Sequence, residues 1–576
     1  YRKYIEKDGA LERRFQMVDH GRAPAEAVRG QAYTWRLRLL VGGDDLTAQL
    51  TGSVDVDREE GAAGVAGFAL YLPPGEPVVP TDWVGRSVSI DYISRNRAGI
   101  VTESRLCTGR LSLPAWDPVV RLLRCECSDG LQQRVEGMSL EAIDALIGGV
   151  WSADLFEPAD GRARWDYALE RLESRPASLD CSPAGALRVT SWYAPPVPHL
   201  VFGPGTVIDG SLQIDLQPLE SQTNCVEIEV GYRYPRLWQH NQSWSWSHPE
   251  YGSTGLQGFC EWRVWTSDLP TTDMIESAVS GSGLQMVGQV GGYKLPLTMA
   301  NPCGDGVAWL NSFDNLWLSA NVTGARRWVQ TVTERYTLVV TAPGGEDEAT
   351  RIVARDSASI EIESERADEW DAGAPDVTPG SEDLSDEPRR QAALSCLLQG
   401  AATALIAAHR GTTVSWQTPT DLALGVDLVH TLHLDDKARA RGKCRRIVHA
   451  LNLDTGAAIT TLSVAVMRGG GTSTPLSIPA APDTSLAPLQ SDLGQLSTQL
   501  GGRLKHPVSG VTIQPYDDDR DGFSGNWDAR DDLTAEQFPR NFVIDSIEIP
   551  AEYTDERIGE AAATYTVGIP NDLMEL

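Results

Sequence analysis

The residues best suited to chemistry lie in an acidic stretch near the C-terminal end, YDDDRDGFSGNWD. Its carboxylates fall on alternate positions before a glycine, and one more stands at the twelfth position: Asp517, Asp519, Asp521 and Asp528. Hard oxygen ligands at this spacing can converge on Ca²⁺, and the glycine permits the sharp turn between them. An EF-hand has Glu at the twelfth position and flanking helices, and neither is evident here. A calcium loop and an acidic surface turn both remain open, and no other cofactor is expected.

A second candidate is a group of aromatic residues near the middle of the chain. The group consists of Trp238, Trp244, Trp246, Trp262 and Trp265. On a strand, Trp244 and Trp246 would share one face. Such rows stack on sugar rings, and they also fill interfaces between subunits. We predict an interface or a packed edge, with a glycan-binding site as the alternative.

Motifs of known catalytic sites are absent from the sequence. It contains no G-x-x-x-x-G-K-[ST], H-E-x-x-H or G-x-S-x-G. With 79 Asp and Glu residues, a glycosidase carboxylate pair can be neither recognised nor excluded. The nine cysteines are odd in number and include no C-x-x-C spacing, so neither a disulfide framework nor a zinc site is expected. We predict that the protein is not an enzyme.

Charge and hydropathy limit the classes of partner. The formal net charge of −30 argues against free nucleic acid or an anionic membrane as the main partner. No run of 18 apolar residues and no secretory signal are found, so no membrane span is expected. A protein made in a reducing cytosol fits these features.

Strand-like alternation is the dominant pattern of the elements that must position these residues. Val54 and Val56 alternate with aspartates, and Phe68, Leu70 and Leu72 repeat the period of two. We therefore predict a mainly β fold with minor α, built from several small antiparallel β-barrels with interspersed helices. The expected units are a first barrel (17–130), a helix-hairpin unit (131–199), a second barrel with the Trp-rich insertion (200–343), an acidic linker (344–390), a helix with a small β-domain (391–468), a linker with a short helix (469–506) and a C-terminal tip (507–576).

Three separated patches carry a resemblance to a known family. The first contains Val54-Asp55-Val56 with its acidic loop, Phe68-Ala69-Leu70, Asp82-Trp83-Val84-Gly85 and Ile90-Asp91-Tyr92. The second is a predicted helix that contains Trp165 and Leu172, followed by the predicted hairpin SLDCSPAGALRVTSW, which ends at Trp192. The third runs from Asp421 to Met467. Together they resemble the baseplate hub, or tail-tip hub, proteins of siphophage-type tails.

The resemblance implies a structural virion protein, assembled in the host cytoplasm and located at the tail tip or baseplate. It implies a homotrimer whose barrels form a pseudo-sixfold ring around the channel for the tape-measure protein and DNA. Implied partners are a distal tail or tail-tube protein, the tape-measure protein and a central fibre or tip protein, without stable nucleic-acid binding. The rival hypothesis is a receptor- or glycan-binding tail protein that uses the Trp-rich segment.

A dense basic run lies in the third patch, and its role stays open. It consists of Lys437, Arg439, Arg441, Lys443, Arg445 and Arg446. It either contacts the tape-measure protein or DNA in transit, or forms a solvated hairpin with acidic neighbours.

Leucines near the C-terminal end recur three and four residues apart: Leu486, Leu489, Leu493, Leu496 and Leu500. This is the a/d spacing of a coiled coil over two heptads. A free helix of this length is marginal, but a trimeric ring would supply the effective concentration that it lacks. A three-helix bundle on the tail axis and a single helix packed on its own chain both remain open.

Residues 1–16 differ in character from the rest and resemble a segment of the Clp-type AAA+ chaperones. The tract has no Walker motif, so no ATPase activity is expected from it.

Overall fold

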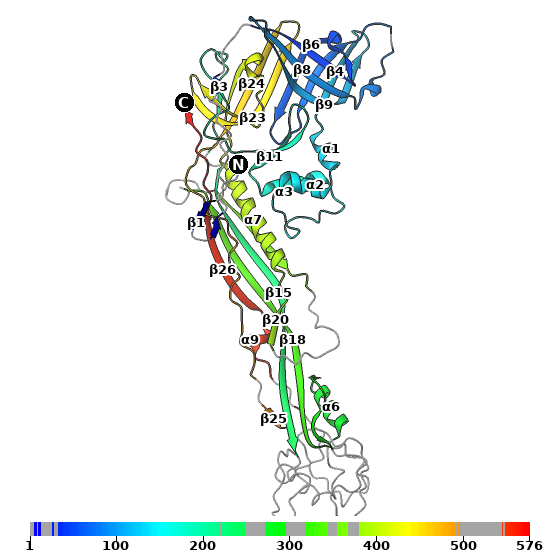
Figure 1. Cartoon of the computed structure of the whole chain (residues 1–576), viewed down its shortest axis with the longest axis vertical. Helices are drawn as coiled ribbons and strands as arrows, with labels where there is room; N and C mark the ends of the chain where they lie inside the picture. The colour runs from blue at the N-terminus through cyan, green and yellow to red at the C-terminus, as the bar shows by residue number, and fades with distance from the viewer. Residues whose placement is uncertain are drawn as a thin grey trace, which may run out of the picture.

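The computed structural model describes residues 5–7, 10–12, 26–27, 33–75, 77–218, 222–247, 271–294, 317–343, 354–366, 380–490, 493–495, 544 and 548–576. Figure 1 shows a long molecule with curled sheets at one end, called the head, and a narrow arm that leaves it. The predicted fold class, mainly β with minor α, is confirmed.

The first half of the head is a sheet curled around its own core. Its neighbours run in the order β6, β7, β10, β9, β8, β4, β5. Alternate side chains face one core, with Leu39, Val54 and Ile90 wholly buried, because an antiparallel sheet with one wet face needs that period. The elements are β4 (Tyr33–Val41), β5 (Asp44–Asp45), β6 (Leu50–Glu59), β7 (Val65–Tyr71), β8 (Ser87–Asn96), β9 (Val101–Asp117) and β10 (Leu122–Ser128), with 3-10 helices at Thr47–Gln49 and Pro80–Trp83.

The second half of the head is a curled sheet with a separate core that contains Trp416 and Phe202. Its elements are β13 (Leu200–Phe202), β14 (Gln213–Asp215), β21 (Thr412–Pro419), β22 (Thr431–Asp435), β23 (Arg439–Asn452) and β24 (Ala457–Val466), with a 3-10 helix at Thr420–Ala423. Strand β23 also pairs with β6, so both halves belong to one continuous sheet. The predicted bounds of a second barrel at 200–343 are therefore wrong, because the chain leaves the head after β14 and returns to it only at β21.

The helix-hairpin unit lies under the head and has its own small core. It contains α1 (Leu131–Glu136), α2 (Leu140–Ile147), α3 (Arg164–Glu173) and the hairpin of β11 (Ala177–Cys181) and β12 (Leu187–Ser191). The hydroxyl of Ser139 accepts a hydrogen bond from the backbone N–H of Ala142 at 3.3 Å and caps α2 as its position predicts.

The arm is built on two exceptionally long antiparallel strands, β15 (Thr223–Ser247) and β18 (Trp317–Thr341). Each has 25 residues, which at the rise of a strand is about 80 Å. Strand β19 (Ala354–Glu363) pairs in parallel with β15, and β26 (Arg557–Thr566) pairs in parallel with β18. Strand β20 (Gly380–Asp383) extends the edge beside β15.

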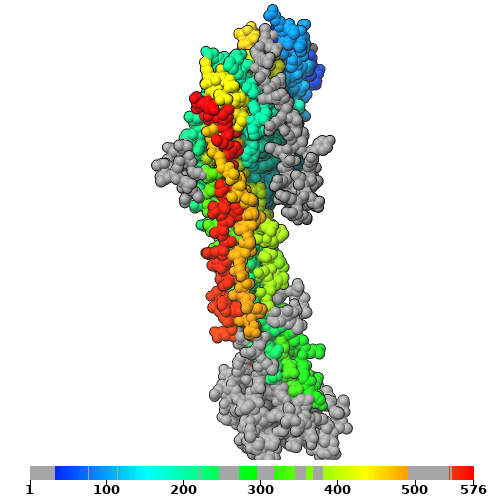
Figure 2. Space-filling view, turned by 60° about the vertical axis from the view of Figure 1, so that its left-hand side comes forward, coloured from blue at the N-terminus to red at the C-terminus, as the bar shows by residue number. Residues whose placement is uncertain are grey.

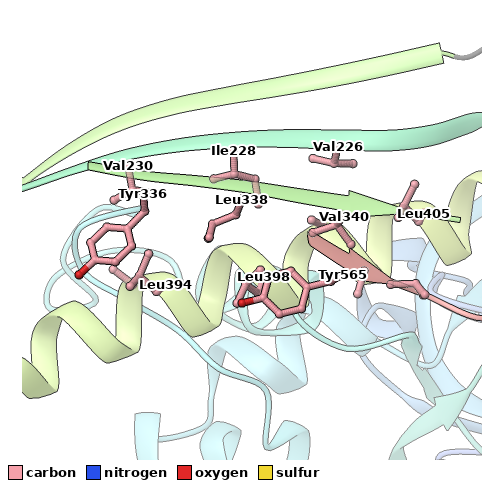
Figure 3. Close-up of a cluster of buried hydrophobic side chains, with 14 of the residues drawn as sticks. Val226, Ile228, Val230, Tyr336, Leu338, Val340, Leu394, Leu398, Leu405 and Tyr565 are labelled. Carbon is pink, nitrogen blue, oxygen red and sulfur yellow. The ribbon is translucent and has the colours of Figure 1, made fainter. Parts of the chain in front are cut away.

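Helix α7 (Glu387–Ala408) covers one face of this sheet. Figure 3 shows Leu394, Leu398 and Leu405 of α7 facing side chains of β15 and β18, among them Ile228 and Leu338. By length and composition α7 alone, among the described helices, qualifies as a membrane span, and half of its apolar window is buried inside the protein. Its burial against the sheet is the arrangement of a core helix.

Shorter elements complete the two ends of the arm. At the far end, α6 (Thr272–Gly281), β16 (Gln285–Met286) and β17 (Gly291–Lys294) adjoin β18. The remaining elements are β1 (Ile5–Lys7), β2 (Ala10–Glu12), β3 (Glu26–Ala27), β25 (Leu493–Gln495), α9 (Ala551–Thr554) and β27 (Met574–Glu575). Since β26 lies along the arm and β27 pairs with β23 in the head, the described part of 507–576 is not the separate tip that we predicted.

Candidate functional site

Two of the five predicted tryptophans lie in the interior of the arm. Trp238 is 1% exposed and Trp244 is 4% exposed, so neither offers a ring face to a sugar. Trp246 follows on the same strand, β15. Trp262 and Trp265 lie outside the described residues. Trp238 and Trp244 are therefore core residues of the arm, and the role of the five tryptophans as a group stays a prediction.

Trp238 joins three segments that are far apart in the sequence. Its ring stacks on Trp328 of β18 at 6.1 Å between centroids and meets Tyr553 of α9 edge-on at 5.2 Å. Its indole N–H donates to the side-chain oxygen of Gln330 at 2.9 Å. The amide nitrogen of Gln330 donates to the carbonyls of Glu552 and Asp555, each at 2.9 Å. The pairing satisfies a buried indole and holds the C-terminal segment on the arm.

The leucine series does not form the predicted helix where the structure describes it. Leu486 and Leu489 lie in a segment that is neither helix nor strand, and Leu493 begins the short strand β25, which pairs in parallel with β15. Leu496 and Leu500 lie outside the described residues. Pro482 and Pro488 explain the difference, since proline restricts the residue before it to extended backbone and donates no helical hydrogen bond.

The predicted linker is instead an ordered strap, defined here as residues 469–490. Figure 2 shows it in orange, beside the red C-terminal segment along the arm. Thr484 is 5% exposed, and the guanidinium of Arg236 donates to its carbonyl at 2.7 Å and to its hydroxyl at 3.0 Å. Tyr553 donates to the carbonyl of Ala487 at 2.8 Å. Polar side-chain contacts thus hold this end of a Pro-rich segment, and an antiparallel bridge between Gly470 and Ile569 holds its beginning.

The calcium candidates Asp517, Asp519, Asp521 and Asp528 lie outside the described residues. Within the part that the structure describes, no group of three or more His, Cys, Asp or Glu side chains could hold a metal ion. The calcium loop therefore stays a prediction.

A buried ion cluster, found only in the structure, joins the head to the unit below it. Asp427, in the loop before β22, accepts hydrogen bonds from Arg58 of β6 at 2.7 Å and from Arg188 of β12 at 2.9 Å. Arg188 also donates to Asp180 of β11 at 2.7 Å. Arg58 is 5% exposed and donates again to the carbonyl of Cys181 at 3.0 Å.

Electrostatics keep Asp427 ionised in this cluster. Burial by itself would raise the pKa of its carboxyl, but hydrogen bonding from Arg188 and the charges of Arg58 and Arg188 outweigh that effect. The pKa of Asp427 is lowered to about 2. Asp180 shows the opposite balance, since burial dominates and raises its pKa.

Two further ion pairs fasten α7 and the arm to the rest. Just beyond the C-terminal end of α7, Arg410 forms a bidentate pair with Glu60, and both side chains are less than a tenth exposed. The guanidinium of Arg410 also lies over the ring of Trp192 at 5.2 Å. At the N-terminal end, Arg389 donates to Asp154 of the helix-hairpin unit at 2.6 and 2.8 Å.

The basic run lies on and just before β23, and much of its charge is neutralised by the chain itself. Lys437 pairs with Asp209, Arg439 with Glu575, and Arg446 with Asp57. Lys443 is 6% exposed and donates to the carbonyl of Val429. These pairs agree with the hairpin that has acidic neighbours.

No sequence signal pointed to the ion cluster, because Arg58 and Asp427 are 369 residues apart. Charged residues that are distant in the sequence and come together only in the folded chain form no recognisable sequence motif.

Comparisons with known proteins return structural likenesses alone. No family model and no curated protein matches the sequence. The tail protein from Neisseria meningitidis MC58 is similar at 12% identity and a TM-score of 0.36, over 75% of this chain and 96% of that one. The 43 kDa tail protein of prophage MuSo2 from Shewanella oneidensis is similar at 10% identity and a TM-score of 0.35, over 75% and 98%.

A prophage tail protein from Listeria monocytogenes EGD-e is similar at 7% identity and a TM-score of 0.28, over 74% of this chain and 94% of that one. At TM-scores below 0.5, these likenesses establish neither a common arrangement of the whole chain nor an activity. These three structures are tail proteins, the class that the sequence resemblance names.

Proposed function

We propose that this chain is the central hub of a phage tail tip or baseplate. It acts as a homotrimer that joins the tail tube to a central fibre or tip and surrounds the channel for the tape-measure protein and DNA. Its role is mechanical rather than enzymatic. It is assembled in the host cytoplasm and incorporated at the end of the tail.

The observation that carries the proposal is the pairing of β6 with β23, which fuses two curled sheets with separate cores into one continuous sheet. Three copies of such a chain present six curled sheets. A closed threefold assembly of these units would therefore match a sixfold tube on one face and a threefold tip on the other.

The arm supports the same role. Its long strands, α7 and the strap form one packed body. The Arg410–Glu60 pair fixes that body to the head, and the Arg389–Asp154 pair fixes it to the helix-hairpin unit. A ring that transmits load between the tube and a tip needs a stiff extension of this kind. The distal tail or tail-tube protein would meet the head, and the fibre or tip protein would meet the arm.

Negative-stain images of the purified full-length chain test the proposal. Class averages should display a threefold ring with arms on one side. Isolated rods without a ring would contradict the hub. Binding of the wild-type chain on a glycan array, lost on Trp262→Ala with Trp265→Ala, would favour the receptor-binding rival instead.

We further propose that Asp517, Asp519, Asp521 and Asp528 bind Ca²⁺. Alternating carboxylates before a glycine support it. Calorimetric titration of the full chain should give a heat of binding that Asp519→Asn with Asp521→Asn abolishes. No heat from the wild type at millimolar Ca²⁺ would end the proposal.

A further inference from the structure

An apolar groove lies where the helix-hairpin unit meets α7. Its volume is about 510 Å³. Small residues of α7, namely Gly400, Ala404 and Ala407, line one side, while Trp165 and Leu169 of α3 line another. Leu169 is 41% exposed and Ala404 and Ala407 are exposed, so no described side chain fills the groove. It is of a size that takes a few aliphatic side chains from a partner.

The same chain carries an exposed apolar projection at the turn between β9 and β10, called here the valine knob (Val119 and Val120). Val119 is 89% exposed and Val120 is 54% exposed. The turn is held in shape from below, since the carboxylate of Asp117 accepts hydrogen bonds from the backbone N–H of Val119 at 3.0 Å and of Val120 at 3.3 Å.

Arg121 closes the turn in a strained conformation. With φ at 55°, it is the only non-glycine residue in the left-handed region among the described residues. Its guanidinium donates to the carbonyls of Leu72 at 2.7 Å and Pro73 at 2.9 Å and lies over the ring of Trp116 at 5.3 Å. These contacts fix the turn and so preorganise the valine knob.

Charge on the two surfaces is complementary. Arg124, exposed on β10 close to the knob, has no ion pair with any described residue. Glu173, exposed on the rim of the groove, likewise has no cationic partner in the described part of the chain. Partial burial, followed by the charge of Glu170, raises the pKa of Glu173, and a neighbouring cation would reverse that effect.

We propose that the valine knob of one copy inserts into the α3–α7 groove of a second copy of this chain, with Arg124 of the knob strand pairing with Glu173 on the rim. Because knob and groove lie at different places on one chain, the contact is heterologous. A heterologous contact closes a ring when its rotation is a whole fraction of a turn, and the proposed trimer requires a rotation of one third. The inference rests on the proposed trimer and names the side chains that hold it together.

The test compares variants of the full-length chain by native mass spectrometry and analytical ultracentrifugation at micromolar concentration. Val119→Asp with Val120→Asp should weaken assembly by roughly tenfold or more, as loss of a central interface anchor does. The matched control, Ile100→Asp with Val101→Asp, places the same charges on the β8–β9 turn, where both residues are about 60% exposed, and should assemble normally.

A charge exchange gives the sharper result. Arg124→Glu and Glu173→Arg should each reduce the trimer fraction, and the double variant should recover it, which a folding defect would not do. A midpoint temperature of thermal unfolding equal to that of the wild type shows that each variant is folded. The inference alone is overturned if the wild type is a trimer and either the Asp variant still forms that trimer or the double charge-exchange variant does not recover it. A monomeric wild type overturns the proposed trimer together with it.

Discussion

At the scale of single residues, the chain depends on buried charges that satisfy one another. The carboxylate of Asp427 accepts hydrogen bonds from Arg58 of the head and from Arg188 of the helix-hairpin unit. It is therefore the negative charge that neutralises arginines of both units. Breaking a buried pair from one side is costly because the remaining charge stays buried without a partner.

Asp427→Asn should therefore lower the free energy of unfolding by about 3–5 kcal/mol near neutral pH. The pKa of Asp427 is depressed in the fold to about 2, so its stabilisation is present above the ordinary aspartate pKa and is lost as pH falls through the folded value. Urea unfolding from pH 7 down to pH 2 should show the wild-type advantage shrinking below about pH 4. An advantage that does not change with pH would contradict this assignment.

Sequence reasoning succeeded where neighbouring residues decide the structure. The alternation around Val54 and Val56 predicted strand β6, because that signal is local. The leucine series failed because its spacing occurs in a stretch where Pro482 and Pro488 impose extended backbone.

At the scale of elements, the arm is a composite of segments distant in sequence. Strand β15 pairs with β18, which follows about seventy residues later, and β26 adds an edge from near the end of the chain. The alternation of apolar residues predicts each strand, but it does not predict the strand with which it pairs. For this reason the predicted second barrel had the wrong bounds. The composition of the strap likewise resembles a flexible linker, although its contacts with Arg236 and Tyr553 are specific.

Trp238→Ala should destabilise the arm by about 3–5 kcal/mol, because it removes a buried ring that touches Trp328 and Tyr553. Hydrogen exchange should rise in α9 and β26, which the ring helps to hold. Val329→Ala, on an exposed position of β18, is the control and should change little. Equal protection of α9 in wild type and Trp238→Ala would refute the role given to this ring.

The strap should resist limited proteolysis despite its Pro- and Ser-containing sequence. Arg236→Ala removes the donor to Thr484 and should make cleavage between 475 and 490 faster, with the head still intact. Peptide mapping by mass spectrometry measures the rate of cleavage between 475 and 490 and shows whether the head stays intact. Rapid cleavage there in the wild type would mean that the strap is not held in solution.

At the scale of the whole molecule, two curled sheets share one continuous sheet, and a long arm is fastened to them through the buried Arg410–Glu60 pair. An assembly of several such chains would bring the curled sheets into a ring and leave the arms projecting. A lone chain would leave the valine knob and the α3–α7 groove without partners.

The most direct test of the proposed homotrimer is the native mass of the purified wild-type chain at micromolar concentration. The proposed homotrimer should give a species of three chain masses that persists on dilution to the lower micromolar range. A single chain mass over the whole range would contradict it.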